Sequence, residues 1–330
     1  MSKITLNKSN FFYNLDKIKA KTKDISKIAL VLKDNAYGHG LIEMATIAKE
    51  YGIQKAVVRS YDEAMAVVDF FEYVLVLADT PKSAHEKILY TINDADSIEN
   101  FPEGTRVELK VNTSMNRNGV NKEEIAVCIT KIQEQGLKLE AIFMHHSCAD
   151  ESNGNYELQK SNFESIKKEA PEGLRFHSCN SAALFREDDF SEDMVRVGIA
   201  AYGCMELDTK FSSVNLRAVL SLTAKKISSR KLQKGESVGY GATFVADDAV
   251  VVSNYDFGYG DGFLRACSGR YKTPEDVKIA GRISMDNSSF LTDKEHLLIF
   301  NDARAVAPYA QTISYEVLTS LKSYIKREII

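Results

Sequence analysis

The sequence lacks the features that would place it in a membrane, on a nucleic acid or in a disulfide-bonded fold. Its longest apolar runs, such as YVLVLA at 73–78, are far too short to span a bilayer, and its first residues contain no apolar signal segment. Lys plus Arg total 42 against 46 Asp plus Glu, and no basic block indicates nucleic acid as a partner. The five cysteines are widely spaced without a CxxC pair, which argues against a disulfide framework and against a zinc site. We therefore expect a cytoplasmic protein with reduced thiols and no metal.

Two nucleotide-binding patterns are also missing. Neither GxGxxG nor GxxxxGK[ST] occurs, so the sequence offers no Rossmann or P-loop phosphate site. The chain does have 330 residues, of which 44% are hydrophobic, and this is the composition of a globular protein with a large core. A chain of this length has room for one barrel and a smaller domain.

Short apolar runs alternate with amphipathic segments through the first two thirds of the chain. The amphipathic segments predict helices at 41–52, 61–71, from Pro81, at 122–136 and at 155–169. Eight apolar runs predict parallel strands, at 28–32, 55–59, 73–78, 89–92, 106–111, 138–145, 174–179 and 194–198. Eight such units predict a (β/α)8 barrel over residues 1–211, although the first few residues could instead belong to the second domain.

The texture changes at about residue 212. Short β-like runs separated by Gly, Asn and Asp turns follow, and they predict a mainly β domain over residues 212–330. The segment SYEVLTSLKSYIKREI, residues 314–329, has a helical pattern and predicts a helix close to the end of the chain.

Polar residues stand where the predicted barrel strands end. In such barrels the loops that follow the strands assemble the active site, so residues at these ends are expected to share one rim. Five residues occupy such ends: Lys33, Lys110, His145, Ser181 and Arg196. One polar strand end is unremarkable, but five on one rim predict a site.

Two of these positions indicate a particular cofactor chemistry. Ser181 and Gly198 follow the seventh and eighth strands, where barrels of this kind commonly bind a phosphate group through backbone N–H groups. Lys33 would face that phosphate site, and a lysine amine forms an imine with the aldehyde of pyridoxal 5'-phosphate. The residues therefore predict a pyridoxal phosphate site.

A series of motifs resembles the alanine racemase family in order and spacing, from about residue 4 to 320. They include both VLKDNAYGHG, which contains Lys33, and VGYGATF, which contains Tyr240, and this makes the combination specific. The motifs are VLKDNAYGHG, LKVNTSMNRNG, HHSCADE, NSAA, VRVGIAAYG, VGYGATF, GYGDGFLR, GRISMDN and TISYEVL.

The resemblance implies a racemase that interconverts L-alanine and D-alanine, a small-molecule substrate, by a two-base mechanism. Such an activity supplies D-alanine for bacterial peptidoglycan. It implies Lys33 as the residue that binds the cofactor and as one acid/base, and Tyr240 of a partner subunit as the other, so that a homodimer has two composite sites. Arg196 would pair with the pyridine nitrogen of the cofactor, and His145 would link Arg196 to Tyr240.

The resemblance also implies roles for residues around the cofactor and at the entrance. Arg117 would contact the cofactor and the substrate carboxylate, and Met285 would add a contact across the subunit interface. Lys110 would carry a carbamate, with an unmodified lysine as the alternative. The remaining cofactor-binding positions would be Tyr37, Ser181, Gly198, Ile199 and Tyr315. The substrate entryway would consist of Asp150, Tyr259, Arg265, Arg282, Asp286 and Ile313.

The sequence departs from the family pattern at four positions: Asp34, Asn112, Ser114 and Asn116. Since residues alternate on a strand, we expect the side chain of Asp34 to point away from Lys33. Three other functions stay open: a racemase of broader specificity that accepts serine, a pyridoxal phosphate carrier without catalysis, and a decarboxylase of basic amino acids. Tyr240 argues against the carrier, and the matched motifs argue against the decarboxylase.

Overall fold

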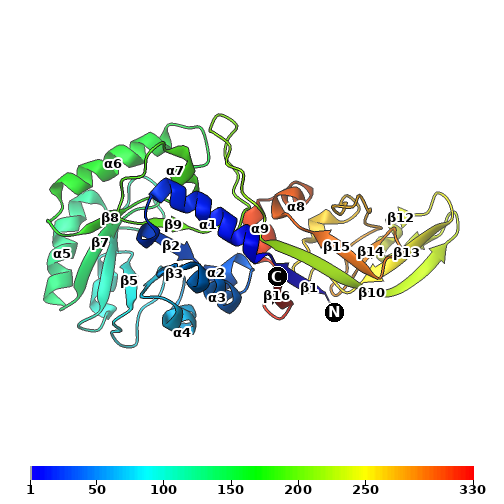
Figure 1. Ribbon diagram of the computed structural model, residues 1–330, viewed down its shortest axis with the longest axis horizontal. Helices are drawn as coiled ribbons and strands as arrows, with labels where there is room; N and C mark the ends of the chain where they lie inside the picture. The colour runs from blue at the N-terminus through cyan, green and yellow to red at the C-terminus, as the bar shows by residue number, and fades with distance from the viewer. Residues whose placement is uncertain (1) are drawn as a thin grey trace.

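The computed structural model describes residues 2–330, which form two parts that lie next to each other along the long axis of the molecule. Figure 1 shows a barrel on the left and a mainly β domain on the right, with both chain ends between them. The long strand β10 (Leu220–Leu232) runs from this junction into the β domain. All five cysteines are free thiols.

The barrel is built from eight parallel strands, as the apolar runs predict. Their hydrogen-bonded order is β8-β7-β6-β5-β4-β3-β2-β9. The eight strands are β2 (Ile28–Val31), β3 (Lys55–Val58), β4 (Tyr73–Val76), β5 (Ile88–Ile92), β6 (Arg106–Lys110), β7 (Lys138–Phe143), β8 (Arg175–His177) and β9 (Val195–Val197). The predicted (β/α)8 fold is confirmed.

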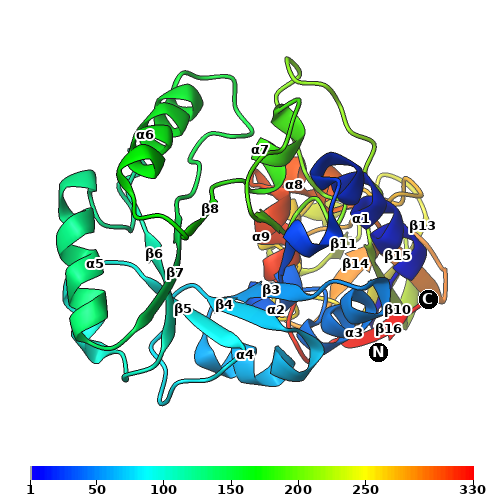
Figure 2. The same ribbon diagram turned by 60° about the vertical axis from the view of Figure 1, so that its left-hand side comes forward.

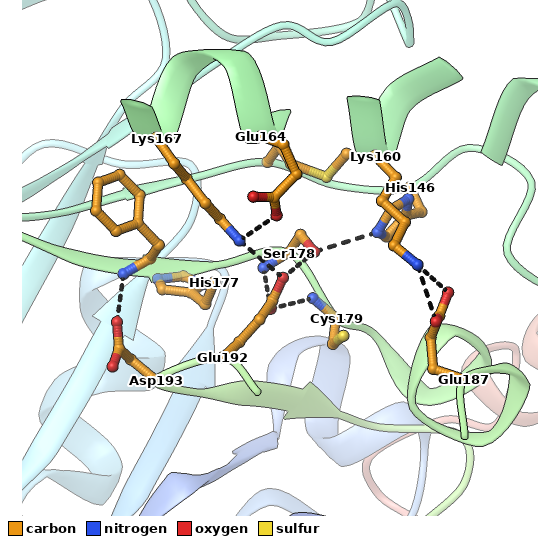
Figure 3. A network of polar contacts seen from close by, with 12 residues as sticks. His146, Lys160, Glu164, Lys167, His177, Ser178, Cys179, Glu187, Glu192 and Asp193 are labelled. Carbon is orange, nitrogen blue, oxygen red and sulfur yellow. Dashed lines mark hydrogen bonds and ion pairs between the residues drawn. The ribbon is translucent and has the colours of Figure 1, made fainter. Parts of the chain in front are cut away.

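The seam between β8 and β9 closes the barrel through few contacts. The Arg196 N–H donates to the Cys179 carbonyl at 3.0 Å, and Asn180 and Arg196 form an isolated bridge. A carboxylate reinforces the seam: Glu192 accepts from the Ser178 N–H at 2.6 Å and from the Cys179 N–H at 3.0 Å, as Figure 3 shows. The short strand β8 is thereby held against the segment that leads into β9.

Helices cover the outside of the barrel (Figure 2). The predicted helices at 41–52 and 155–169 are confirmed, and those at 61–71 and 122–136 form α-helix over most of their length with one 3₁₀ turn each. The helices of this part are α1 (Lys8–Thr22), α3 (Leu41–Tyr51), α4 (Tyr61–Val67), α5 (Ile125–Glu134), α6 (Asn155–Glu169) and α7 (Ser181–Arg186). No helix within residues 2–330 combines the length and the apolar character that a membrane crossing requires.

The helix predicted from Pro81 is wrong. Turns and bends connect β4 to β5 in this segment, and no helix begins there. The sequence PKSAHEK offers no apolar residues spaced three or four apart, so a helix here would have no face to bury against the barrel.

The second part is a six-stranded sheet with two helices and a small hairpin. Its main path is β14-β13-β10-β1-β16, and β15 also pairs with β10. The strands are β1 (Lys3–Leu6), β10, β13 (Val250–Tyr255), β14 (Ser288–Phe290), β15 (His296–Phe300) and β16 (Lys326–Ile329); β11 (Ser237–Val238) and β12 (Phe244–Val245) form the hairpin, and the helices are α8 (Ala303–Ala310) and α9 (Ser314–Thr319). Strand β1 thus carries the start of the chain into this sheet.

The helix predicted over 314–329 is half wrong. It ends at Thr319 as α9, and residues 326–329 form β16, which pairs in parallel with β1. The start of the chain supplies the sheet edge for this pairing, and backbone hydrogen bonds to that edge replace those of a helix. A contact between the two chain ends leaves no signal in the local pattern.

Candidate active site

A cavity of about 650 Å³ opens at the ends of the barrel strands where the sequence predicts a site. It is bounded by the loops that follow the strands and by α9. The structure brings twelve of the predicted site residues together in its wall: Lys33, Tyr37, Lys110, Arg117, His145, Asp150, Ser181, Arg196, Gly198, Ile199, Ile313 and Tyr315.

Lys33 stands at the start of a left-handed turn, α2 (Lys33–Tyr37). Four residues in succession, Asp34 to Tyr37, have φ between 52° and 56°. Since none of the four is glycine, each costs roughly 1–2 kcal/mol relative to the right-handed conformation. Strain of this kind persists only where the surroundings fix it, and it is concentrated at functional sites.

Side chains and a close backbone contact hold this turn in place. Glu63 at the start of α4 accepts from the Asp34 N–H and from the Arg59 N–H, both at 2.7 Å. The turn ends at Gly38, where an added Cβ atom would lie 2.0 Å from the Leu318 carbonyl oxygen in α9. The position of Lys33 therefore depends on the neighbouring barrel loop and on a helix of the second part.

The expectation that Asp34 points away from Lys33 is wrong. The Lys33 Nζ lies 2.9 Å from Asp34 Oδ2, and Arg59 approaches the other carboxylate oxygen at 3.4 Å. The alternation argument assumes a strand, but β2 ends at Val31 and Asp34 is already in the left-handed turn. The turn brings both side chains to the cavity.

Arg196 on β9 is buried with its two terminal amino groups bound by the protein. Nη2 donates to the Met144 carbonyl at 2.7 Å and to the Ser178 carbonyl at 3.2 Å, while Nη1 donates to the His177 ring. Within residues 2–330, no protein acceptor binds its Nε–H. Arg196 lines the cavity, so Nε–H is the donor left for a ring nitrogen, as a pyridine-type cofactor requires.

Cations collect on one wall of the cavity. Lys110 is buried, and this burial together with Arg117 and Arg196 lowers its pKa to about 8. Burial and the same neighbouring cations, Arg196 first, lower the pKa of His145 well below its usual value. The lowered pKa keeps His145 neutral. Its Nδ1 lies 3.5 Å from Arg196 Nη2, so the histidine is next to the arginine, as the family resemblance implies.

The opposite wall forms a small cradle. The N–H groups of Gly198 and Ala200 donate to Ser181 Oγ at 3.1 and 3.3 Å. A Cβ atom on Gly198 would lie 2.9 Å from the Tyr37 hydroxyl, so only glycine allows this approach. The Tyr37 and Tyr315 rings lie 5.8 Å apart. The hydroxyl groups of Tyr37, Ser181 and Tyr315 and the backbone at Gly198 and Ile199 line the same cavity as Lys33. These polar groups fit the phosphate of a cofactor whose aldehyde reaches the lysine.

The other predicted residues lie outside this cavity. They belong to the second part, where the exposed fraction reaches 68% for Tyr240 and 55% for Met285. The Tyr240 turn lies beside Arg282, and the Gly260 N–H donates to the Met285 carbonyl at 2.7 Å, which joins the Tyr259 loop to the same region. We call Tyr240, Tyr259, Arg265, Arg282, Met285 and Asp286 the second-domain group; they come from this part of the chain.

Sequence reasoning missed two residues behind the cavity, Glu108 and His177. Both are fully buried, and the His177 Nε2 lies 2.8 Å from Glu108 Oε2. A signal for Glu108 was present, because a carboxylate two residues before Lys110 shares the face of the strand that points into the barrel.

The fold and the cavity define a class: a two-domain barrel enzyme with a lysine-containing cavity at the ends of its strands. Family models for the alanine racemase N-terminal and C-terminal domains match residues 6–206 and 219–329. The chain belongs to the alanine racemase family, whose members depend on pyridoxal phosphate.

Full-length relatives and solved structures agree with this assignment. The chain is 41% identical to the alanine racemase of a Nitratiruptor species, covering 99% of both chains, and 40% identical to that of Campylobacter curvus, covering 100% of both. It is similar to the structure of alanine racemase from Clostridium difficile 630, with a TM-score of 0.90, 25% identity, and coverage of 100% of this chain and 95% of the other.

Proposed function

We propose that the protein interconverts L-alanine and D-alanine. The observation that supports this most is the single cavity that Lys33, Ser181 and Arg196 line together, in which the Arg196 Nε–H has no protein acceptor within residues 2–330. By its family role the enzyme would supply D-alanine for peptidoglycan in the bacterial cytoplasm. A broader specificity that includes serine is the second candidate, because racemases that accept other small side chains share this fold and most of these motifs.

The residues divide the chemistry between two faces of the substrate. Bound pyridoxal phosphate supplies an electron-withdrawing group that weakens the Cα–H bond of alanine. Lys33 Nζ would remove or return the proton on one face, and the Tyr240 hydroxyl would do so on the other. Two fixed bases avoid the movement that a single base would need to reach both faces.

Arg196 and Arg117 would fix the orientation of the bound molecules. An arginine cannot give up its proton at neutral pH, so Arg196 would present N–H to the ring nitrogen and would keep that nitrogen unprotonated. An unprotonated pyridine ring would accept less of the negative charge that proton removal leaves on the α-carbon. This favours reprotonation of the α-carbon over side reactions. Arg117, which is exposed to the cavity, would bind the alanine carboxylate.

We further propose a homodimer in which the second-domain group of one subunit completes the cavity of the other. Support comes from burial: Tyr240 and Met285 are exposed apolar residues, and neither lines the cavity of its own chain. Residues 212–330 would then act as the domain that delivers Tyr240. Tyr259, Arg265, Arg282 and Asp286 would meet Asp150 and Ile313 at the entryway.

A panel assay tests this proposal. The purified protein with pyridoxal phosphate should racemise alanine faster than serine or lysine, as measured by chiral chromatography of each amino acid. Faster turnover of serine would favour the broader specificity. Lack of racemisation of every amino acid, with cofactor bound, would refute the proposal.

A further inference from the structure

A charged residue lies deep in the barrel, below the cavity. Glu108 on β6 has no solvent exposure, and it belongs to the layer of side chains beneath Lys110. A buried charge is costly, and a well-packed apolar side chain of the same size could fill this space without that cost. The carboxylate therefore calls for an explanation beyond packing.

Three donors surround the two oxygens of Glu108. The Tyr73 hydroxyl donates to Oε1 at 2.5 Å, Arg175 Nη2 lies 3.2 Å from the same oxygen, and His177 Nε2 lies 2.8 Å from Oε2. Burial opposes the charge of Glu108, but His177, Arg175 and Tyr73 outweigh it and hold the pKa of the carboxyl at about 2. The group is an anion at every pH at which the protein would work.

The hydrogen bonds on both sides of His177 fix which ring nitrogen carries the proton. Arginine has no acceptor, so the contact between Arg196 Nη1 and His177 Nδ1 requires a lone pair on Nδ1. The ionised Glu108 only accepts, so the contact at Nε2 requires a proton there. Burial also lowers the pKa of His177, which keeps the ring neutral.

We propose that Glu108 is a positioning residue for the active site: by holding His177 as the Nε2–H tautomer, it orients the Arg196 guanidinium so that Nε–H faces the cofactor. This inference rests on the proposed function. With the other tautomer, Nδ1–H would face Arg196 Nη1 and two donors would oppose each other. Nη1 would keep only the His177 carbonyl, at 3.3 Å, as an acceptor, and the guanidinium would shift about its bonds to the Met144 and Ser178 carbonyls. The tautomer of His177 thus determines how Arg196 meets the pyridine nitrogen of the cofactor.

Glu108→Gln tests the role of the charge, and Glu140→Gln is a matched control. Glu140 on β7 accepts from Arg175 Nη2 at 3.0 Å, so it belongs to the same network, but it makes no contact with His177. In Glu108→Gln, kcat should fall about 10- to 100-fold in both directions, which is the usual loss when a residue that orients a functional group is replaced. KM for alanine should change little, and Glu140→Gln should stay within about twofold of the unaltered enzyme.

A second readout does not depend on activity. In cofactor-free protein labelled with 15N-histidine, the nitrogens of His177, assigned with the His177→Asn variant, should include a protonated Nε2 and an unprotonated Nδ1. Glu108→Gln should raise the fraction with the proton on Nδ1, and Glu140→Gln should not. This experiment gives the same answer even if alanine is not the substrate.

Two results would overturn the proposal. One is a proton on Nδ1 of His177 in the unaltered protein, which decides the matter even if Glu108→Gln does not fold. The other is a folded, cofactor-loaded Glu108→Gln protein whose kcat equals that of Glu140→Gln. If the unaltered protein does not racemise any amino acid but has the Nε2–H tautomer, the proposed function fails and the link from Glu108 to Arg196 stands.

Discussion

The barrel cavity and the second-domain group differ most in burial. Arg196 and Lys110 are at most 9% exposed, whereas Tyr240 is 68% exposed. In the cavity, protein partners bind the Arg196 guanidinium and the Lys33 amine, whereas the second-domain group faces outward. Groups that hold a cofactor must be fixed before it binds, whereas a base that acts from a partner subunit must be on the surface of its own chain.

The two regions share one device, a tight turn with positive φ. Lys33 precedes four left-handed residues, and Tyr240 lies between Gly239 at 80° and Gly241 at 72°, followed by Ala242 at 46°. Turns of this kind project a side chain at an angle that no regular helix or strand provides. Both proposed bases are therefore positioned by local backbone geometry, and they differ in what covers them.

The largest expected loss of activity comes from a substitution in the barrel cavity. Lys33→Ala should lower racemase activity by at least about 10⁴-fold, because it removes both the cofactor attachment and one base. The protein should still fold, since the Lys33 side chain is 35% exposed and its one ion pair is with Asp34. Borohydride reduction followed by peptide mapping should locate the cofactor on Lys33 in the unaltered protein; an adduct on another lysine would contradict the site.

Tyr240→Ala tests whether the second-domain group acts on only one enantiomer of alanine. Exchange of the α-hydrogen of D-alanine with deuterated solvent should persist, because Lys33 handles that enantiomer by family resemblance, while exchange from L-alanine should fall by about 10²- to 10⁴-fold, the usual contribution of a positioned base. Proton NMR of each enantiomer measures both rates. Equal losses for the two enantiomers, with cofactor content intact, would make Tyr240 a positioning residue.

The third prediction concerns the cavity alone: Lys110 should be carbamylated to an extent that depends on pH. Only the neutral amine reacts with carbon dioxide, and with a pKa of about 8 roughly a tenth of Lys110 is neutral at pH 7. The modified fraction should therefore rise as the pH increases from 6 to 8, and the resulting anion would be favoured beside Arg117 and Arg196. Carbon-13 NMR with labelled bicarbonate should show a signal that Lys110→Arg lacks; no signal at pH 8 would leave the lysine unmodified.

The smallest expected effect concerns backbone strain beside the cavity. Ser114 has φ of 103°, in the loop that carries Arg117, and its N–H donates to Asn112 Oδ1 at 3.2 Å. Ser114→Gly should raise the free energy of unfolding by about 1 kcal/mol, because relief of strain exceeds the entropy that glycine adds to the unfolded chain. Thermal unfolding measures this, and Ser152→Gly, an exposed residue without positive φ, should instead lower the midpoint.

Much of the barrel could be predicted because its strands are buried on both faces. Runs such as IALV and YVLV are continuous in apolar residues and are bounded by polar loops, which is the pattern of a central parallel strand. The residues at the ends of these strands then share a rim for geometric reasons. That reasoning predicted Lys33, Lys110, His145, Ser181 and Arg196 on one rim, and the cavity contains all five.

The remaining features depend on contacts that no local pattern records. Asp34 turns towards Lys33 because four residues adopt the left-handed conformation against Glu63, and β16 replaces a helical end because β1 lies beside it. Glu108 is a carboxylate within an apolar strand. Its role can be inferred only from the fold, which places His177 between Glu108 and Arg196.

The measurement that tests the central claim most directly is subunit complementation. Lys33→Ala and Tyr240→Phe chains should each be nearly inactive, and mixing them under conditions that exchange subunits should restore activity. Each mixed dimer has one site with both groups intact, so a mixture in which half of the dimers are mixed should recover about a quarter of the activity of the unaltered enzyme. No recovery, with subunit exchange shown by native mass spectrometry, would contradict a site shared between the cavity of one chain and the second-domain group of another.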